Sequence, residues 1–163
     1  MNRVHFSSES EEYATPNWLF DLLEDEVGGF DIDVCATAQN AKCKRFFTKA
    51  IDGLKQKWEG NIFGNFPYGQ QVTGPWVEKA WLSSLEGATV YCLIPARTDT
   101  TYWHQYVTKA YEIRFLKGRL KFGNAKNSAP FPSAIVIFKP GKHTEPRIRH
   151  VDLRKVQQSL FGC

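Results

Sequence analysis

The sequence contains no apolar run approaching the roughly 18 residues that a membrane-spanning helix needs. Its first twelve residues are polar and lack the apolar stretch of a secretory signal. Cysteine is scarce, and its four positions, Cys35, Cys43, Cys92 and Cys163, show no CxxC spacing. These absences argue against a membrane protein and against a zinc site. We expect a cytoplasmic protein with reduced thiols and no bound metal.

The glycine-rich GxGxxG fingerprint of dinucleotide sites is also missing. So is a strong charge of either sign, since 21 Lys and Arg face 17 Asp and Glu, for a net charge of +4. This balance is compatible with a nucleic-acid partner but does not identify one. Apolar content is ample for a core, at 42% of 163 residues with 14% aromatic. We therefore expect a flexible arm over residues 1–12 and a single domain over 13–163.

Strand signals and helix signals alternate along the chain. Apolar runs predict strands, and amphipathic spacing behind a Thr or Pro predicts helices. The expected strands lie at 30–36, 62–63, 88–95, 111–116 and 133–138, and the expected helices at 16–27, 75–82, 101–107 and 151–160. The first helix should use Thr15 as its N-cap and Pro16 as its first residue. This alternation predicts a three-layer α/β domain with a mixed, mostly parallel sheet.

The segment Asn65-Phe66-Pro67-Tyr68 follows the second expected strand, where α/β proteins place ligand-handling residues. The Asn65 side-chain oxygen and the Phe66 carbonyl can each accept one N–H of an exocyclic amine. Pro67 aims that carbonyl by holding Phe66 extended, and Tyr68 offers a ring face for stacking. Two acceptors keep the amine lone pair out of the ring, so positioning alone makes it a nucleophile. Taken in isolation, the same residues also suit an ordinary turn.

The segment resembles the (Asp/Asn/Ser)-Pro-Pro-(Tyr/Phe/Trp) motif of amino-directed DNA methyltransferases, and residues 13–139 as a whole resemble the phage-type DNA N6-adenine methyltransferase (Dam) family. The other motifs that carry the likeness, in order, are Tyr13-Ala14-Thr15-Pro16, Asp33-Val34-Cys35-Ala36, Asn40-Ala41-Lys42, Asp52-Gly53-Leu54 with Trp58, Pro95-Ala96-Arg97-Thr98-Asp99, Arg119-Leu120-Lys121-Phe122 and Pro130-Phe131-Pro132-Ser133-Ala134. The resemblance implies a Rossmann-like methyltransferase fold. It also implies a phage or prophage enzyme of DNA methylation or restriction–modification that uses S-adenosylmethionine to methylate adenine N6.

The resemblance assigns roles to residues whose local sequence leaves them open. It implies catalysis by Asn65, Phe66, Pro67 and Tyr68, and cofactor contacts by Tyr13, Thr15, Pro16, Asp33, Cys35, Ala36, Asn40, Asp52 and Asn65. Asp33 is expected to pair with the α-ammonium of the cofactor. A capped helix explains the segment around Thr15 equally well, and a turn explains Asn40 or Asp52.

The basic, glycine-punctuated stretch 117–127 is the predicted DNA contact. We expect Arg119, Lys121 and Lys126 to meet phosphates and Phe122 to act as a wedge, although a hairpin with Phe122 packed inward fits as well. Arg97 is a further candidate for DNA contact. The target base is expected to leave the duplex stack. Monomer and dimer both remain open.

Phe66 stands where the family has a second proline. The main-chain carbonyl survives this change, but φ is no longer locked, and we expect the ring to be housed beside the target base. Three functions are therefore compatible with the sequence. They are adenine N6 methylation, cytosine N4 methylation with the same acceptors, and cofactor or DNA binding by a catalytically impaired homologue.

Overall fold

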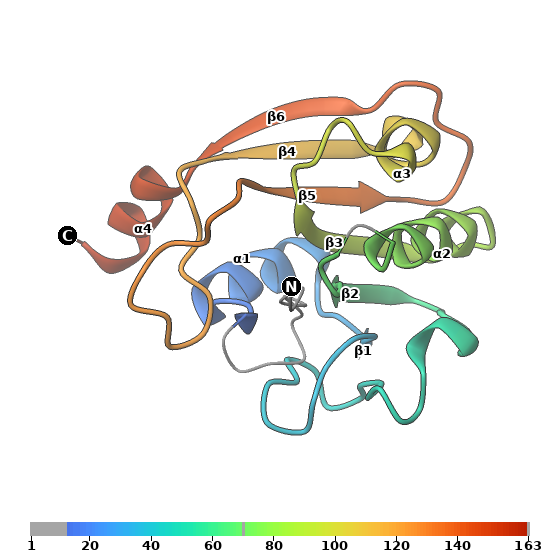
Figure 1. Ribbon diagram of the computed structural model, residues 1–163, viewed down its shortest axis with the longest axis horizontal. Helices are drawn as coiled ribbons and strands as arrows, with labels where there is room; N and C mark the ends of the chain where they lie inside the picture. Colours follow the sequence, from blue (N-terminus) through green and yellow to red (C-terminus); the bar gives the residue numbers. More distant parts are fainter. Residues whose placement is uncertain (1–12, 70, 163) are drawn as a thin grey trace, which may run out of the picture.

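The computed structural model describes residues 13–69 and 71–162, so the arm expected over 1–12 lies outside the described residues. Helices and strands alternate along it, as Figure 1 shows. The helices are α1 (Asn17–Val27), α2 (Thr73–Leu85), α3 (Thr101–Gln105) and α4 (Leu153–Phe161), with 3-10 turns at Gly53–Lys55 and Val107–Lys109. The strands are β1 (Ile32–Asp33), β2 (Asn61–Asn65), β3 (Thr89–Pro95), β4 (Glu112–Lys117), β5 (Ser133–Phe138) and β6 (Arg147–Asp152). Within these residues no helix is long and apolar enough to cross a bilayer.

The strands form one six-stranded sheet in the order β1-β2-β3-β5-β4-β6. β5 runs antiparallel to both of its neighbours, whereas β1, β2 and β3 pair in parallel, as do β4 and β6. The predicted mixed, mostly parallel sheet is confirmed. β1, β2, β3, β4 and β6 all finish at the same end of the sheet, which is where β5 begins. We call this end the carboxyl edge. It carries the segment after β2 and the start of α4.

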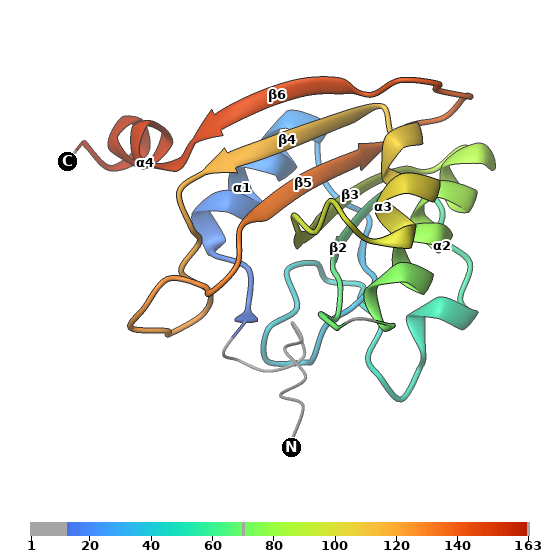
Figure 2. The same cartoon turned by 45° about the horizontal axis from the view of Figure 1, so that its top comes forward.

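Helices cover both faces of the sheet. Along β3, the side chains of Val90, Cys92 and Ile94 enter a core with α2 and α3. Those of Tyr91 and Leu93 enter a second core with α1. This alternation is the period of two that a strand buried on both faces must show. Figures 1 and 2 show the resulting three layers, with α1 on one side of the sheet and α2 and α3 on the other.

Three local predictions need correction. The first strand is only Ile32–Asp33, because the chain beyond it bends so that the Ala36 N–H bonds to the Phe47 carbonyl. The N-cap of α1 is Pro16, because the Thr15 hydroxyl is engaged by Asn65 instead. β6 was not predicted at all. Its sequence, RIRHVD, is largely exposed and has no apolar face, so only its pairing with β4 defines it.

A buried charge cluster fastens α1 to the sheet. Arg114 on β4 donates hydrogen bonds to Glu112 on the same strand and to Glu26 near the end of α1. The Arg114 and Glu112 side chains are only 8% and 4% exposed. Hydrogen bonds from Arg114 lower the pKa of the Glu26 carboxyl. Because water reaches neither charge on β4, each depends on the other for compensation.

Replacing Arg114 with alanine leaves the Glu112 carboxylate buried without its closest partner. We expect the free energy of unfolding to fall by about 3–5 kcal/mol, measured by urea denaturation. The control is Lys57→Ala, which removes an exposed ion pair with Glu59 and should cost less than about 1 kcal/mol. Equal, small losses in the two variants would contradict a stabilising role for the cluster.

Candidate active site

β2 carries Asn65 to the carboxyl edge, where its side chain joins three segments. The amide nitrogen donates to the Tyr13 carbonyl at 2.9 Å and to the Thr15 hydroxyl at 3.0 Å. The amide oxygen accepts from the Tyr68 hydroxyl at 2.7 Å. Asn65 is only 2% exposed, so these bonds fix which way the amide faces. Its oxygen therefore points toward Tyr68, and its nitrogen points toward the start of α1.

The Tyr68 ring is packed in an aromatic cluster on the α1 side of the sheet. Its centroid lies 5.1 Å from that of Phe131 and 6.0 Å from that of Tyr13, both edge to face. Burial raises the pKa of the Tyr68 phenol well above its ordinary value, so the group stays neutral and donates. The Asn65 oxygen has two lone pairs, so a substrate amine can share it with the Tyr68 hydroxyl or displace that hydroxyl.

Phe66 lies on the opposite side of the sheet, which corrects our expectation that its ring is housed beside the target base. The ring is fully buried and stacks on Trp76 at 5.6 Å, with Trp58 at 6.0 Å. Gly64 makes room for it, since a Cβ at that position would lie 2.2 Å from the Phe66 ring. The benzyl group is thus part of the core.

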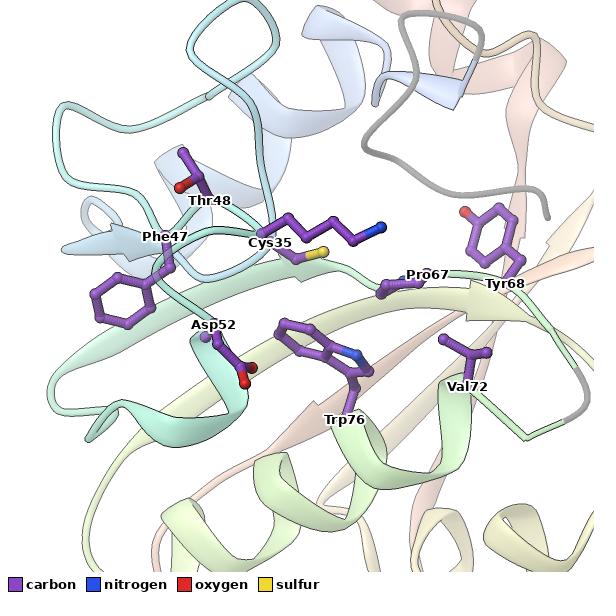
Figure 3. Close-up of a pocket in the computed structure, with 10 residues that line it drawn as sticks. Cys35, Phe47, Thr48, Asp52, Pro67, Tyr68, Val72 and Trp76 are labelled. Carbon is purple, nitrogen blue, oxygen red and sulfur yellow. The ribbon is translucent and has the colours of Figure 1, made fainter.

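A cavity of about 550 Å³ opens between this segment and the loop that follows β1. This size is within the range of small-molecule and cofactor sites. Its lining residues are Cys35, Phe47, Thr48, Lys49, Asp52, Gly53, Pro67, Tyr68, Val72 and Trp76. Figure 3 shows Asp52 at one end and Tyr68 at the other, with Trp76 between them. Aromatic rings and a carboxylate on one wall suit a nucleoside, because they offer stacking and an acceptor for hydroxyl groups.

Two further cavities continue from the first across the ends of β1 and β2. A small one shares Cys35 with the large cavity and is lined by Ala14, Thr15, Asp33, Cys35, Asn40, Lys42 and Asn65. The next has a volume of about 300 Å³ and is lined by Ala14, Thr15, Pro16, Asn17, Gln39, Asn40, Lys42, Gly123 and Asn124. Because neighbouring cavities share lining residues, they form one series that runs from Trp76 to the start of α1.

Opposite charges face the middle of this series. Asp33 is 3% exposed, and its carboxylate accepts the N–H groups of Cys35 at 3.3 Å and Lys42 at 3.2 Å. Burial raises the pKa of Asp33 to about 7, although these two N–H groups and the Lys42 charge oppose the shift. Burial also lowers the pKa of the Lys42 ammonium, which donates to the Asn17 side chain. One acid and one ammonium group side by side match the zwitterionic head of an amino acid.

The structure brings most of the predicted cofactor residues together. Thr15, Pro16, Asp33, Cys35, Asn40, Asp52 and Asn65 all line the series of cavities. Tyr13 reaches it through its carbonyl bond to Asn65. Ala36 is buried and lines none of the three cavities, and it holds the loop after β1 through its N–H bond to Phe47.

Sequence reasoning gave no site role to several cavity residues, among them Trp76, Phe47 and Lys42. Trp76 lies in the helix predicted over 75–82 and packs in the core, and it also lines the large cavity. Phe47 lies outside every predicted strand and joins the cavity because its chain segment pairs with the end of β1. Lys42 belongs to one of the motifs that carry the resemblance, and its backbone N–H bonds to the Asp33 carboxylate.

The predicted DNA residues separate into two groups. Arg119, Lys121 and Lys126 are exposed on the loop between β4 and β5, and Arg97 is exposed after β3. Phe122 is 1% exposed and packs with Tyr13 and Tyr68, so its role as a wedge between bases is corrected. The Phe122 side chain packs inward, which is the alternative that the sequence also allowed.

The three-layer arrangement and the mixed sheet define the class of Rossmann-like folds. The fold is similar to that of a Listeria monocytogenes protein described as a class I S-adenosylmethionine-dependent methyltransferase, with a TM-score of 0.50 and 13% identity. That similarity covers 88% of this chain and 56% of the other. A sequence profile of the DNA N-6-adenine-methyltransferase (Dam) family matches residues 5–159, and the chain belongs to this family.

Two curated relatives agree with this assignment. The DNA N-6-adenine-methyltransferase of Haemophilus phage HP1 is 30% identical over 142 residues, which is 82% of this chain and 81% of the relative. The DNA N-6-adenine-methyltransferase of Escherichia phage T1 is 26% identical over 110 residues, which is 66% of this chain and 45% of the relative. The predicted family is confirmed.

Removing the Phe66 ring tests whether it is a core residue. We expect Phe66→Ala to lower the free energy of unfolding by about 3–5 kcal/mol, because it opens a cavity between Gly64 and Trp76. The matched control is Phe161→Ala on α4, where the side chain is 59% exposed and the loss should stay near 0.5 kcal/mol. Urea denaturation compares the two, and a small loss for Phe66→Ala would contradict the packing described.

Proposed function

We propose that this chain transfers a methyl group from S-adenosylmethionine to N6 of adenine in DNA, using Asn65 and the Phe66 carbonyl as paired acceptors. The observation that carries the proposal is the position of Asn65. Its buried amide forms part of the wall of the cavity series and bonds directly to Tyr68, the residue assigned to the base. Membership of the Dam family supports the same chemistry.

The cavity series fits the cofactor in two parts. Phe47, Asp52 and Trp76 in the large cavity would hold the adenosine, through ring faces and a carboxylate for the ribose hydroxyls. Asp33 and Lys42 would hold the α-ammonium and the α-carboxylate. When bound, S-adenosylmethionine supplies an electrophilic methyl group on its sulfonium. Because the two parts meet near Cys35, the methyl group would lie within reach of the Asn65 side.

The protein prepares the base by holding its amine. The Asn65 oxygen accepts one amine hydrogen, alongside or in place of the Tyr68 hydroxyl, and the Phe66 carbonyl accepts the other. These bonds turn the nitrogen lone pair out of the ring, and Tyr68 stacks on the base plane. The base must first leave the duplex, at a cost of a few kcal/mol. Since Phe66 keeps its ring in the core, the missing second proline does not block this step.

The same acceptors would hold the N4 amine of cytosine, so the reaction product decides between the two bases. Incubating duplex DNA with labelled cofactor, and then digesting it to deoxynucleosides, separates N6-methyl-2′-deoxyadenosine from N4-methyl-2′-deoxycytidine. We expect the label in the adenine nucleoside. Label confined to the cytosine nucleoside would overturn the proposed target, and cofactor binding with no label in any base would support the catalytically impaired alternative.

Substitutions at Asn65 test the acceptor role. We expect Asn65→Ala to lower kcat by about 100-fold or more, by analogy with the loss of one positioned hydrogen-bonding group. Asn65→Asp keeps an acceptor and should recover most of the activity. Cofactor affinity and thermal melting are measured alongside, because Asn65 also bonds to Tyr13 and Thr15. A folded Asn65→Ala protein with the wild-type rate would refute the role.

Tyr68 separates stacking from hydrogen bonding. Tyr68→Phe keeps the ring and removes the hydroxyl that competes for the Asn65 oxygen, so we expect activity to be retained. Tyr68→Ala removes the stacking face and should raise the KM for DNA, by an amount matching about 1–3 kcal/mol of base stacking. Steady-state kinetics with a short duplex compare the two. Equal loss in both variants would mean that the hydroxyl, rather than the ring, is needed.

The pKa of Asp33 predicts a pH dependence for cofactor binding. Below its pKa of about 7 the carboxyl is protonated in the free protein and cannot pair with an ammonium group. We expect the Kd for S-adenosylhomocysteine, measured by calorimetry, to weaken about tenfold per pH unit below that value, with proton release on binding. Asp33→Asn should bind more weakly at neutral pH and lose this dependence. Binding that does not weaken below this pKa would contradict the pairing.

The same raised pKa also affects folding. Because the folded protein holds this proton more tightly than the unfolded chain does, the stability of the free protein falls as pH rises from about 4 to 7.

A further inference from the structure

Positive charge gathers in several segments of this protein. The stretch 42–57 has six Lys or Arg and only Asp52, and two further basic segments meet at the carboxyl edge. The basic loop, residues 118–132, has three Lys or Arg and no Asp or Glu, and residues 147–161, which form β6 and α4, have four Lys or Arg and only Asp152. Since the whole chain has a net charge of +4, the remaining residues are net acidic. An uneven distribution of this kind is the electrostatic footprint of a nucleic-acid surface.

The topology places both segments on one side of the molecule. β6 pairs in parallel with β4, so α4 begins at the carboxyl edge, where the basic loop leaves β4. Figure 2 shows α4 and this loop at the same end of the sheet. The Lys117 ammonium donates to Asp152 at 3.2 Å, which links the end of β4 to the start of α4. The basic loop and the start of α4 therefore form one rim at this edge, whereas Arg147 lies at the other end of β6.

Leu153 connects this rim to the aromatic cluster around Tyr68. It is 5% exposed and belongs to the same core as Tyr68, Leu120 and Phe122. The next two residues, Arg154 and Lys155, are exposed in the first turn of α4, and their N–H groups bond to the Asp152 carboxylate. Their cationic side chains thus project from a turn that is anchored in the same core as the proposed base-binding residue.

A duplex that delivers a base to Tyr68 has to approach the carboxyl edge. α1 covers one face of the sheet, α2 and α3 cover the other, and the carboxyl edge is where the cavity series opens. Apart from Leu153, α4 has no buried residue. α4 therefore adds mainly exposed side chains to this edge, among them the cations of Arg154 and Lys155.

We propose that α4 and the basic loop form one DNA-backbone surface, in which Arg154 and Lys155 contact phosphates of the duplex at a distance from the target base. This inference rests on the proposed function. Flexible cations next to a helix start bind phosphate without reading bases, so they position the duplex and carry no sequence preference. The exposed apolar residues Leu160 and Phe161 offer an alternative use of α4, as a contact with a second copy. Such a contact would bring the cations of two copies together, which favours DNA as the partner.

The test removes the two cations and measures DNA binding against salt. Arg154→Ala/Lys155→Ala should weaken binding of a labelled duplex about 10- to 100-fold at low salt and reduce the slope of log K against log salt by about two. In steady-state assays the loss should fall on the KM for DNA and leave the KM for the cofactor unchanged. The matched control is Lys139→Ala/Lys142→Ala, which removes two cations that follow β5 at the opposite edge of the sheet. It should leave both the affinity and the slope as in the wild type.

Other outcomes overturn the inference. An unchanged salt slope in Arg154→Ala/Lys155→Ala would show that α4 does not meet the backbone. If Leu160→Asp/Phe161→Asp converts a dimer into a monomer in sedimentation velocity and loses the same affinity, α4 acts through a second copy instead. The two proposals fail separately. A wild-type protein that methylates no adenine refutes the proposed function, whereas normal methylation with no effect of the α4 cations refutes only this surface.

Discussion

The hydrogen bonds of one buried amide organise this site. Asn65 ends β2, and its side chain links the segment before α1 to the Tyr68 hydroxyl. Its partners Tyr13 and Thr15 lie 52 and 50 residues away in the sequence, and Tyr68 lies three residues away. A buried amide left without partners would cost free energy, so these segments must adopt their positions together. The cavity wall, the start of α1 and the aromatic cluster are consequences of that single constraint.

The two faces of β2 explain how the chain accommodates Phe66. Successive residues of an extended strand point to opposite faces, so Gly64 and Phe66 serve the α2 side while Phe63 serves the α1 side. The glycine and the phenylalanine form a pair, since the ring occupies the space that a Cβ on Gly64 would take. The ring also supports Trp76, which lines the large cavity. The bulky side chain at this position is thereby accommodated by packing on the α2 side of the sheet.

The sequence was informative where burial alone decides structure. β3 and β5 were predicted almost to the residue, because they are continuous apolar runs buried on both faces. β6 was missed, because a largely exposed edge strand is specified by its neighbour and not by its own pattern.

The site residues also differ in whether the local sequence or tertiary contacts determine their position. Asn65 and Asp33 were predicted from their places at strand ends, whereas Trp76, Phe47 and Lys42 enter the cavities only through tertiary contacts. Phe122 was ambiguous for this reason too, since a hairpin phenylalanine can face either way until the cluster around it is known.

Net charge was uninformative because it is an average over unlike regions. The buried carboxyl of Asp33 and the ammonium of Lys42 cancel within the cavity series, and burial weakens the ionisation of both. On the outside, the basic loop and the first turn of α4 place exposed cations at the carboxyl edge. Cations at this edge attract a polyanion to the side where the cavity series opens. The proposed cofactor, a small zwitterion with a positive sulfonium, would instead meet paired opposite charges inside, at Asp33 and Lys42. One edge of the sheet can therefore receive two ligands of different charge, because surface cations serve one and buried paired groups serve the other.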